Sequence, residues 1–186
     1  MPFVETGIPD LLVFEPKVFG DSRGYFFESF NEKNFTERGI GVKFVQDNES
    51  SSAYGVIRGL HYQLAPYTQA KLIRVIEGSI LDVVADMRRG SPAYGKSFSL
   101  ELTGENKKQL FIPAGFAHGF SVLSEKAVVL YKCDKFYNRE SEDGIRYDDP
   151  QLNIDWKIPA DKAIISDKDK SLPLFADGKA NFHYNS

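Results

Sequence analysis

The chain contains a single cysteine, Cys133, among its 186 residues. One thiol cannot form an intramolecular disulfide, so a disulfide-stabilised secreted scaffold is excluded and a reducing compartment is favoured. The surrounding residues Tyr131-Lys132-Cys133-Asp134 have no spacing typical of metal ligands. We therefore expect Cys133 to be a small packed side chain of the interior and not a nucleophile.

The chain also lacks long apolar runs and an excess of positive charge. No run approaches the roughly 20 apolar residues that span a bilayer, so we expect no membrane partner. The N-terminus carries Glu5 and Asp10 and no basic segment before an apolar core, which argues against a signal peptide and for a cytoplasmic protein. The net charge of -3 argues against nucleic acid as a partner.

Strand patterns dominate the sequence. Residues 97–102 alternate strictly between polar and apolar, with Phe98, Leu100 and Leu102 on one face. Residues 71–76 and 80–85 are rich in β-branched side chains. The Glu77-Gly78-Ser79 stretch between these two runs predicts a tight hairpin.

Helix signals are few. Asn31 is placed to cap a helix over Glu32–Arg38, with Phe30 and Phe35 as its hydrophobic staple and Gly39 as its stop. The tail from about 150 to 186 is rich in Asp, Lys and Pro, and we expect turns and one or two short helices there.

The fold class expected from these patterns is mainly β. Residues 127–131 add another strand, and many short strands separated by Gly, Pro and Asp turns are typical of a β-sandwich or barrel. No repeat or linker interrupts the chain, so we expect one domain over residues 1–186, with the tail packed on the barrel.

Side chains that could take part in catalysis or binding recur along the predicted strands and loops: Gln46, Asn48, Arg58, His61, Lys71, His118 and Tyr131. Inward-facing residues of successive strands in a two-sheet barrel converge on one cavity. Arg58 and His61 are three residues apart, so on a regular strand they face opposite ways. A bulge at Gly59 is what would turn both toward one cavity.

A metal site is not expected. The run from Pro113 to His118 resembles the second motif of the cupins, whose metal-binding members also carry a His-x-His pair followed by Glu. In this chain Gln63 stands in place of the second histidine, and Tyr67 and Thr68 stand where the acid would be. Two of four ligands are too few for a typical first-row metal, so a metal-dependent cupin oxygenase or isomerase is disfavoured and no cofactor is expected.

Without a metal, the remaining residues suit proton abstraction next to a carbonyl group. A histidine serves as base near neutral pH, and a lysine ammonium stabilises the enolate oxygen. A tyrosine on the opposite side of the substrate returns the proton and inverts the carbon. Arginines hold a charged group such as a diphosphate.

A series of motifs from about residue 8 to 173 extends this interpretation. They are FEPKVFGD (14–21), RGYFFE (23–28), FVQDN (44–48), RGLHYQ (58–63), QAKL (69–72), QLFIPAGFAHGF (109–120), LYKC (130–133) and SDKD (166–169). In this order and spacing they resemble the dTDP-4-dehydrorhamnose 3,5-epimerase (dTDP-4-keto-6-deoxyglucose 3,5-epimerase) family.

This resemblance implies a cupin-like jelly-roll barrel without metal, working as a homodimer that exchanges an N-terminal strand. The implied substrate is a dTDP-linked 4-keto-6-deoxyhexose, epimerised at carbons 3 and 5. His61 matches the base, Asp169 the carboxylate that orients it, Tyr131 the proton donor and Lys71 the residue at the enolate oxygen.

The resemblance also implies a set of substrate-binding positions. They are Arg23, Phe26, Glu28, Gln46, Asn48, Arg58, His118, Glu142 and Lys168, with Tyr137 as a residue that stacks on the base. Lys168 and Asp169 depend on aligning residues 166–169 with the family's Ser-x-Lys-Asp. Two departures are visible, Glu49 in place of a frequent His and Tyr25 in place of Phe.

Alternatives stay open at the sequence level. The same residue set occurs in mono-epimerases that act at carbon 3 or carbon 5 only, and a sugar-nucleotide-binding cupin without turnover would keep the pocket. Taken singly, Lys71 resembles a surface lysine, Asp169 resembles a solvated loop residue, and Arg23 and Arg58 resemble structural ion-pair partners.

Overall fold

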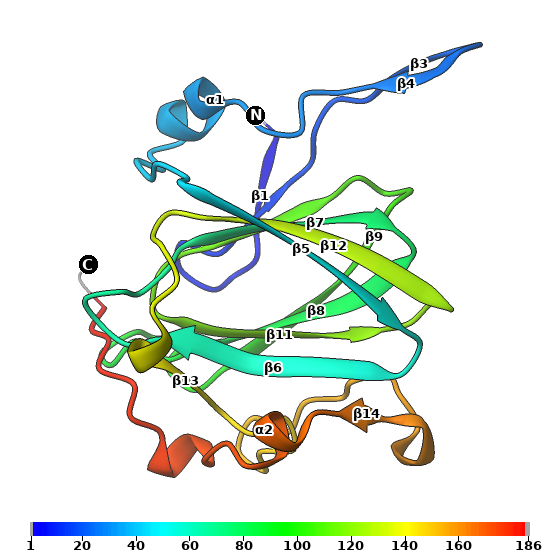
Figure 1. Ribbon diagram of the computed structural model, residues 1–186. Helices are drawn as coiled ribbons and strands as arrows, with labels where there is room; N and C mark the ends of the chain where they lie inside the picture. The colour runs from blue at the N-terminus through cyan, green and yellow to red at the C-terminus, as the bar shows by residue number, and fades with distance from the viewer. Residues whose placement is uncertain (1, 185–186) are drawn as a thin grey trace.

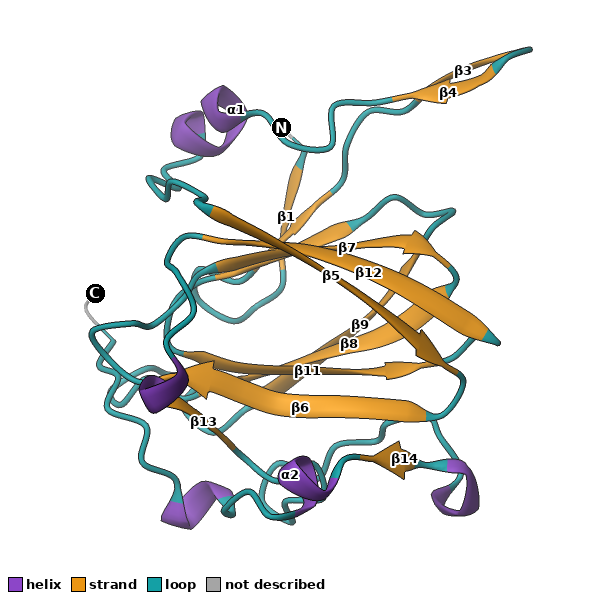
Figure 2. Ribbon diagram, in the orientation of Figure 1, coloured by secondary structure: helices purple, strands orange, loops and turns teal. Residues whose placement is uncertain are grey.

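Two β-sheets face each other in the computed structural model, which describes residues 2–184 (Figures 1 and 2). The first sheet has the strand order β1-β2-β10-β7-β12-β5. Its strands span Phe3–Glu5 (β1), Leu12–Phe14 (β2), Gln46–Ala53 (β5), Lys71–Glu77 (β7), Gln109–Ile112 (β10) and Lys126–Cys133 (β12).

The second sheet has the order β13-β6-β11-β8-β9, and the short β14 pairs with β6. Its strands span Val56–Gln63 (β6), Ser79–Asp86 (β8), Ser97–Thr103 (β9), Phe116–Val122 (β11), Glu142–Gly144 (β13) and Ile164–Ile165 (β14). The remaining strands, Phe19–Asp21 (β3) and Gly24–Phe26 (β4), form a separate hairpin. The helices are Glu32–Glu37 (α1) and Asp167–Lys170 (α2), with 3-10 turns at Arg139–Ser141, Ala160–Lys162 and Phe175–Asp177.

The chain alternates between the sheets from β5 to β8 and again from β9 to β12, so the fold is a cupin-like jelly roll. The hairpin predicted between residues 71–76 and 80–85 is therefore wrong. β7 pairs with β10 and β12, whereas β8 pairs with β9 and β11 in the other sheet. Gly78, at φ +78°, forms a tight turn that leads the chain from one sheet to the other. A glycine turn between two strands of one sheet has the same sequence pattern.

The predicted alternation of strand 97–102 is confirmed. Leu102 is buried between the sheets, and Phe98 and Leu100 pack against the same cluster. This cluster also takes in Ile80 and Val84 from β8 and Ile73 and Val75 from β7. Apolar burial of this kind is the main stabilising term of a barrel interior.

β8 is buried on both faces, which explains why residues 80–85 are almost uninterruptedly apolar. Leu81, Val83 and Ala85 point away from the interior and pack with tail residues such as Trp156 and Phe175. In Figure 1 the tail runs along the outside of the second sheet, below β6 and β13. It contains the short helix α2 and two 3-10 turns, as the sequence predicted.

The N-terminal helix forms as its capping signals indicate. The Asn31 side chain accepts a hydrogen bond from the Lys33 backbone N–H at 3.1 Å, and the Phe30 and Phe35 rings lie 5.0 Å apart. Gly39 follows the helix at φ +89°. Phe35 and Phe14 belong to an apolar cluster on the outer side of the first sheet, so this helix covers part of that face.

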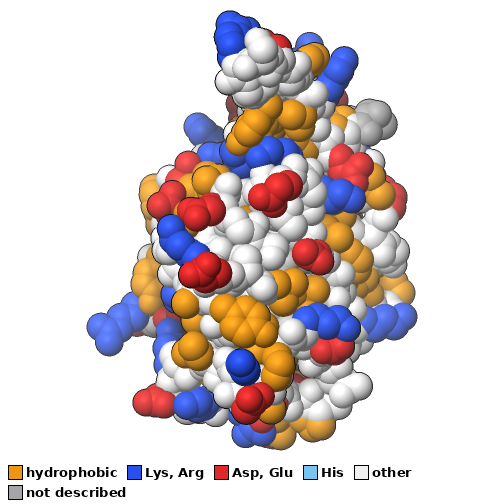
Figure 3. Space-filling model, turned by 90° about the vertical axis from the view of Figure 1, so that its right-hand side faces the viewer, with side chains coloured by type: hydrophobic (Ala, Val, Ile, Leu, Met, Phe, Trp, Pro, Cys, Tyr) orange, Lys and Arg blue, Asp and Glu red, His pale blue; other side chains and the backbone are white. Residues whose placement is uncertain are grey.

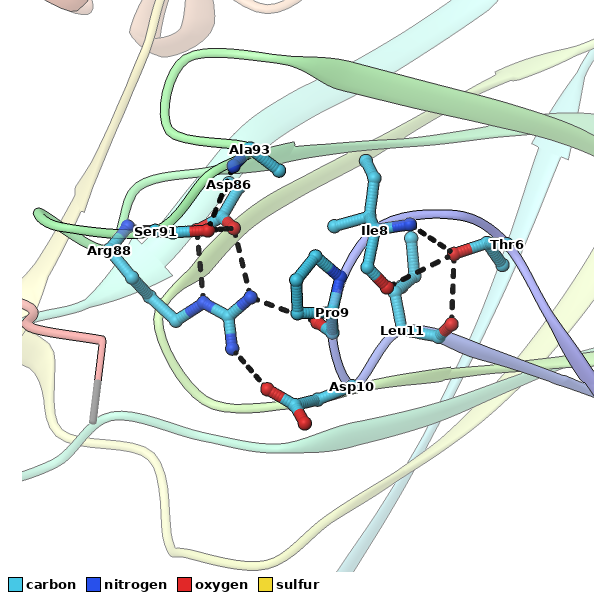
Figure 4. A network of polar contacts seen from close by, with 9 residues as sticks. All are labelled: Thr6, Ile8, Pro9, Asp10, Leu11, Asp86, Arg88, Ser91 and Ala93. Carbon is cyan, nitrogen blue, oxygen red and sulfur yellow. Dashed lines mark hydrogen bonds and ion pairs between the residues drawn. The ribbon is translucent and has the colours of Figure 1, made fainter. Parts of the chain in front are cut away.

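A network of polar contacts ties the end of β8 to the N-terminal loop (Figure 4). The Arg88 guanidinium donates to both carboxylate oxygens of Asp86, at 3.0 and 2.9 Å, and also to Asp10 and the carbonyl of Pro9. Ser91 donates to Asp86 at 2.6 Å. Asp86 is fully buried and Arg88 nearly so, and all of this network lies outside the cavity described below.

The β3–β4 hairpin stands away from the barrel (Figures 1 and 3). In the space-filling view it forms a narrow protrusion with hydrophobic side chains at its base. Phe19, Tyr25 and Phe26 on this hairpin are all more than half exposed, which is unusual for aromatic side chains. Within residues 2–184, no helix has the length and apolar character required to cross a membrane.

Candidate active site

A cavity of about 270 Å³ opens between the two sheets at one end of the barrel. Side chains of both sheets line it, together with residues of two rim loops. The lining residues are Gln46, Asn48, His61, Tyr62, Gln63, Gln69, Lys71, Tyr131, Tyr137 and Glu142. Seven of these were candidate site residues on sequence grounds, and the folding of five separate strands and one loop brings them together.

A bulge in β6 brings Arg58 and His61 onto the inner side of the second sheet. His61 lies opposite His118 of β11 and Arg58 lies opposite Phe120, so two residues of β6 between these pairs face a single residue of β11. Gly59 is required at this point, because a Cβ atom there would lie 2.6 Å from the Gly119 Cα. The bulge expected at Gly59 is confirmed, and Arg58 then reaches Ser52 of the first sheet through a 3.0 Å hydrogen bond.

His61 is paired with a carboxylate from the tail. Its Nε2 atom lies 2.8 Å from Asp169 Oδ1, and Asp169 Oδ2 accepts a hydrogen bond from the Gly59 N–H at 3.1 Å. Burial alone would raise the pKa of Asp169, but its hydrogen bonds with His61, Gly59 and Ser166 hold that pKa below the usual value. Asp169 is therefore an acceptor, so in the neutral tautomer of His61 that this bond favours, Nε2 carries the proton and Nδ1 carries the lone pair.

The first sheet contributes Lys71 and Tyr131 to the opposite wall. Burial lowers the pKa of the Lys71 amine, although the charges of Cys133, Asp82 and Glu142 act the other way. Burial raises the pKa of the Tyr131 phenol, partly offset by the nearby Arg58. Tyr131 is thus a protonated phenol at neutral pH.

Cys133 is almost fully buried beside Asn48, whose amide nitrogen lies 3.7 Å from Sγ. Burial raises the pKa of its thiol, which keeps the sulfur protonated and unreactive. The prediction that Cys133 is an interior side chain is confirmed.

His118 lies behind the cavity wall and has its own carboxylate partner. Its Nε2 atom is 3.0 Å from Asp82 Oδ2, and both residues are buried. Asp82 Oδ1 has no hydrogen-bond partner. The sequence reasoning missed Asp82, although a carboxylate at an inward position between Ile80 and Val84 was a usable signal.

The rim of the cavity consists of two loops joined by Gln63. Its amide nitrogen donates to the Tyr67 carbonyl at 2.8 Å, and its oxygen accepts from the Asn138 N–H at 2.6 Å. The position compared above with a cupin metal ligand thus holds a residue that connects the two loops. Gln69 adds a further bond across the rim, to the Lys135 carbonyl at 2.7 Å.

Glu142 links the rim to the tail. It accepts a hydrogen bond from the Tyr137 hydroxyl at 2.8 Å and pairs with Lys168 at 2.6 Å. Burial opposes ionisation of Glu142, but the contacts with Lys168 and Tyr137 hold its pKa below the usual value. The Tyr137 backbone N–H also donates to Gln46, whose amide nitrogen donates to Asn48.

Three candidate residues lie away from this cavity, on the β3–β4 hairpin or just after it. Arg23 and Phe26 are on the projecting β3–β4 hairpin and Glu28 follows it, and they line other surface hollows. The Arg23 side chain is 88% exposed and forms an ion pair with Asp21. Within one chain, these residues do not meet His61 or Tyr131.

The arrangement is suited to moving protons at a carbon next to a carbonyl group. A histidine with a free Nδ1 comes from one sheet, a protonated phenol comes from the other, and a lysine lies in the same cavity. Within residues 2–184, no group of three or more His, Cys, Asp and Glu side chains is arranged to hold a metal ion.

Comparisons with known proteins agree with this geometry. A sequence model of the dTDP-4-dehydrorhamnose 3,5-epimerase family matches residues 5–177. The dTDP-4-dehydrorhamnose 3,5-epimerase of Shigella flexneri is 52% identical over 178 residues, which cover 95% of this chain and 97% of that protein.

Solved structures are similar over the same span. The dTDP-6-deoxy-D-glucose-3,5-epimerase of Legionella pneumophila, in complex with dTDP-4-keto-L-rhamnose, has a TM-score of 0.94 at 46% identity, covering 99% of this chain and 98% of that one. A 3'-monoepimerase from Streptomyces bikiniensis has a TM-score of 0.84 at 31% identity, covering 91% and 86%. The chain therefore belongs to the dTDP-4-dehydrorhamnose 3,5-epimerase family.

Proposed function

We propose that this protein epimerises a dTDP-linked 4-keto-6-deoxyhexose at carbons 3 and 5, converting dTDP-4-dehydro-6-deoxyglucose into dTDP-4-dehydrorhamnose. The observation that carries the proposal is the pairing of His61 with Asp169 on one wall of the cavity, across from Tyr131 and Lys71 on the other. The family relationship supports the same reaction, because its 3,5-epimerases are more similar to this chain than the monoepimerase is.

His61 acts as the base in the proposed reaction. Its Nδ1 lone pair takes the proton from the carbon beside the ketone, and the ionised Asp169 stabilises the imidazolium that forms. The electron pair of the broken C–H bond passes to the ketone oxygen and gives an enolate. Lys71 stabilises this oxyanion, which is usually the largest single contribution to such a reaction.

Tyr131 returns a proton to the other side of the enolate. Because Tyr131 and His61 come from opposite sheets, a sugar ring between them loses hydrogen on one side and gains it on the other. The carbon is inverted as a result. The same pair serves both carbons that flank the ketone.

The nucleotide extends beyond the cavity in this proposal. The volume of about 270 Å³ is slightly below the roughly 300–1,000 Å³ of typical ligand pockets, so it suits the sugar alone. Arg58 is placed to bind the diphosphate, with Gln46, Asn48, Glu142 and Lys168 along the way out. The exposed Tyr137 ring at the rim stacks on the base, and His118, held by Asp82, supports the sugar from behind.

The proposal is tested by product NMR in deuterium oxide. The wild-type protein incorporates two deuterons, at carbons 3 and 5. His61→Ala abolishes incorporation at both carbons, whereas Tyr131→Phe retains exchange but slows completed inversion. His183→Ala and Tyr94→Phe are the matched controls, because both residues lie outside the cavity.

The outcomes separate the alternatives. One deuteron indicates a mono-epimerase, and tight binding without exchange indicates a non-catalytic sugar-nucleotide-binding cupin. Exchange at the wild-type rate in His61→Ala removes His61 as the base. Wild-type inversion by Tyr131→Phe removes the tyrosine as the proton donor.

We further propose that the protein is a cytoplasmic homodimer in which each β3–β4 hairpin reaches the partner subunit. The aromatic side chains of the hairpin support this proposal, because they remain more than half exposed within residues 2–184. The partner's cavity would then receive Arg23, Phe26 and Glu28. We also propose that the tail from about residue 150 belongs to the same domain as the barrel, since it supplies Asp169 to His61.

Mixed dimers test this exchange. Arg23→Ala and His61→Ala are each expected to be weakly active or inactive alone, and refolding them together restores activity because hybrid dimers contain one intact site. A mixture that stays inactive, or a wild-type protein that sediments as a monomer, would contradict the proposal. Phe26→Asp is expected to shift the sedimentation toward the monomer.

A further inference from the structure

A one-turn helix presents Asp169 to His61. The helix α2 comprises only Asp167–Lys170, and the preceding strand β14 pairs in parallel with β6 at Val56 and Ile57. The strand that carries His61 therefore also anchors the segment that carries its carboxylate. Helices of four residues are not stable by themselves, so contacts at their ends decide their geometry.

The contact at the start of this turn comes from Ser166. Its backbone is extended, and its Oγ atom accepts a hydrogen bond from the Asp169 N–H at 3.1 Å. Asp169 is thus held at two places, by Ser166 at its backbone and by His61 and Gly59 at its carboxylate. Asp169 is only 4% exposed, whereas Ser166 is exposed and does not line the cavity.

We infer that Ser166 is a positioning residue for the reaction, acting on the His61–Asp169 pair through the cap of α2. The inference rests on the proposed function. Without the Ser166 hydroxyl the Asp169 N–H loses its acceptor, the turn opens, and the carboxylate leaves the line of the His61 Nε2–H bond. A small displacement of this kind lowers the rate of the chemical step without removing any group that binds the substrate.

The first measurement compares steady-state kinetics of Ser166→Ala with those of the wild-type protein. We expect kcat to fall about tenfold while KM changes less than about twofold, because the variant alters the base and not the binding contacts. Ser166→Thr and Ser166→Asp restore most of kcat, since both side chains cap helices.

Ser171→Ala is the matched control for the same turn. Ser171 is also exposed, and its hydroxyl donates to the Lys168 carbonyl at 2.7 Å, at the opposite end of α2. Its loss weakens the turn without releasing the Asp169 N–H. We therefore expect wild-type kinetics from this variant.

The decisive measurement repeats Ser166→Ala in an Asp169→Asn background. If Ser166 acts through the carboxylate, the second change lowers kcat no further. An equal loss of kcat in both backgrounds overturns the inference. So does a Ser166→Ala protein with wild-type kcat and only a lower thermal midpoint, which is the signature of a purely structural cap.

The two proposals fail in different ways. Full activity of Asp169→Asn removes the base pair of the proposed function itself. A large loss in Asp169→Asn together with wild-type kinetics in Ser166→Ala leaves the proposed function intact and removes only the role of Ser166.

Discussion

Two cations lie inside the same barrel in opposite circumstances. The Arg88 guanidinium donates hydrogen bonds to both carboxylate oxygens of Asp86, to Asp10 and to the Pro9 carbonyl. It also packs on the rings of Phe116 and Tyr184. Within residues 2–184, Lys71 has no such partner. The carboxylates whose charges reach it, Asp82 and Glu142, are paired with His118 and Lys168 instead.

The difference follows from what each group must do. Removing a charge from water is costly, and a network such as that of Arg88 recovers the cost through complete pairing. Lys71 is only half-buried and has no ion-pair partner within residues 2–184, so its donors remain available to an oxyanion that enters the cavity. Incomplete pairing of buried polar groups distinguishes the proposed site from the structural network.

Arg88→Met is expected to have the largest effect and to act on stability alone. It leaves Asp86 buried without its counter-ion, which costs about 3–5 kcal/mol of unfolding free energy. Urea denaturation measures this loss. The protein that remains folded should keep the wild-type kcat, because Arg88 does not line the cavity. A tenfold fall in kcat would contradict the view that the Arg88 network serves stability and not catalysis.

Lys71→Met is expected to have the opposite effect, lowering activity without lowering stability. It removes the cation at the enolate oxygen and is expected to lower kcat about 10²–10³-fold. The free energy of unfolding should stay the same or rise, because a half-buried charge without an ion-pair partner is replaced by an apolar side chain of similar length. A lower free energy of unfolding for Lys71→Met would show that Lys71 stabilises the fold, as Arg88 does.

Ser91→Ala tests how much a single bond of the complete network contributes. The hydroxyl donates to Asp86 at 2.6 Å and accepts from the Ala93 N–H at 3.1 Å. Losing a hydrogen bond to a buried carboxylate costs about 1.5–3 kcal/mol, with kinetics unchanged. Thermal unfolding followed by circular dichroism provides the measurement, and an unchanged midpoint would show that the network is redundant.

The smallest of these expected effects is the change that Asp169→Asn makes to the acid dependence of stability. The pKa of Asp169 in the folded protein lies below its ordinary value of 3.8. Its ionised form therefore stabilises the protein above about pH 4, and this contribution is lost as the pH falls through the folded-state pKa. The thermal midpoint of the wild-type protein should decline more steeply below about pH 4 than that of the variant. Parallel curves would show that the pairing with His61 contributes nothing to stability.

Local sequence signals predicted the local structure well. The Asn31 cap, the Phe30–Phe35 staple and the bulge at Gly59 all depend on residues near each other in the chain, and all three are confirmed. The hairpin at Gly78 failed because a glycine turn does not encode which sheet the next strand joins. That choice depends on partners such as β11 and β12, which follow much later.

The site was predicted unevenly for the same reason. Inward positions of alternating strands indicated a common cavity for His61, Lys71 and Tyr131. Nothing local indicated Asp169, which lies 108 residues from His61 in a stretch of mixed charge, and only the family's Ser-x-Lys-Asp pattern pointed to it. The Arg88 network was not predicted, because its members are polar residues in loops whose burial depends on the whole fold.

The late position of Asp169 has a consequence during synthesis. Four strands of the cavity walls, β5, β6, β7 and β12, have been synthesised by the time residue 133 is added, so a nascent barrel can assemble its core and much of its pocket once they leave the ribosome. The acid that orients His61 arrives some three dozen residues later, with the turn that docks on β6. A polypeptide released before that point would contain most of the sugar cavity but lack the base pair, so translation must pass residue 169 before turnover begins.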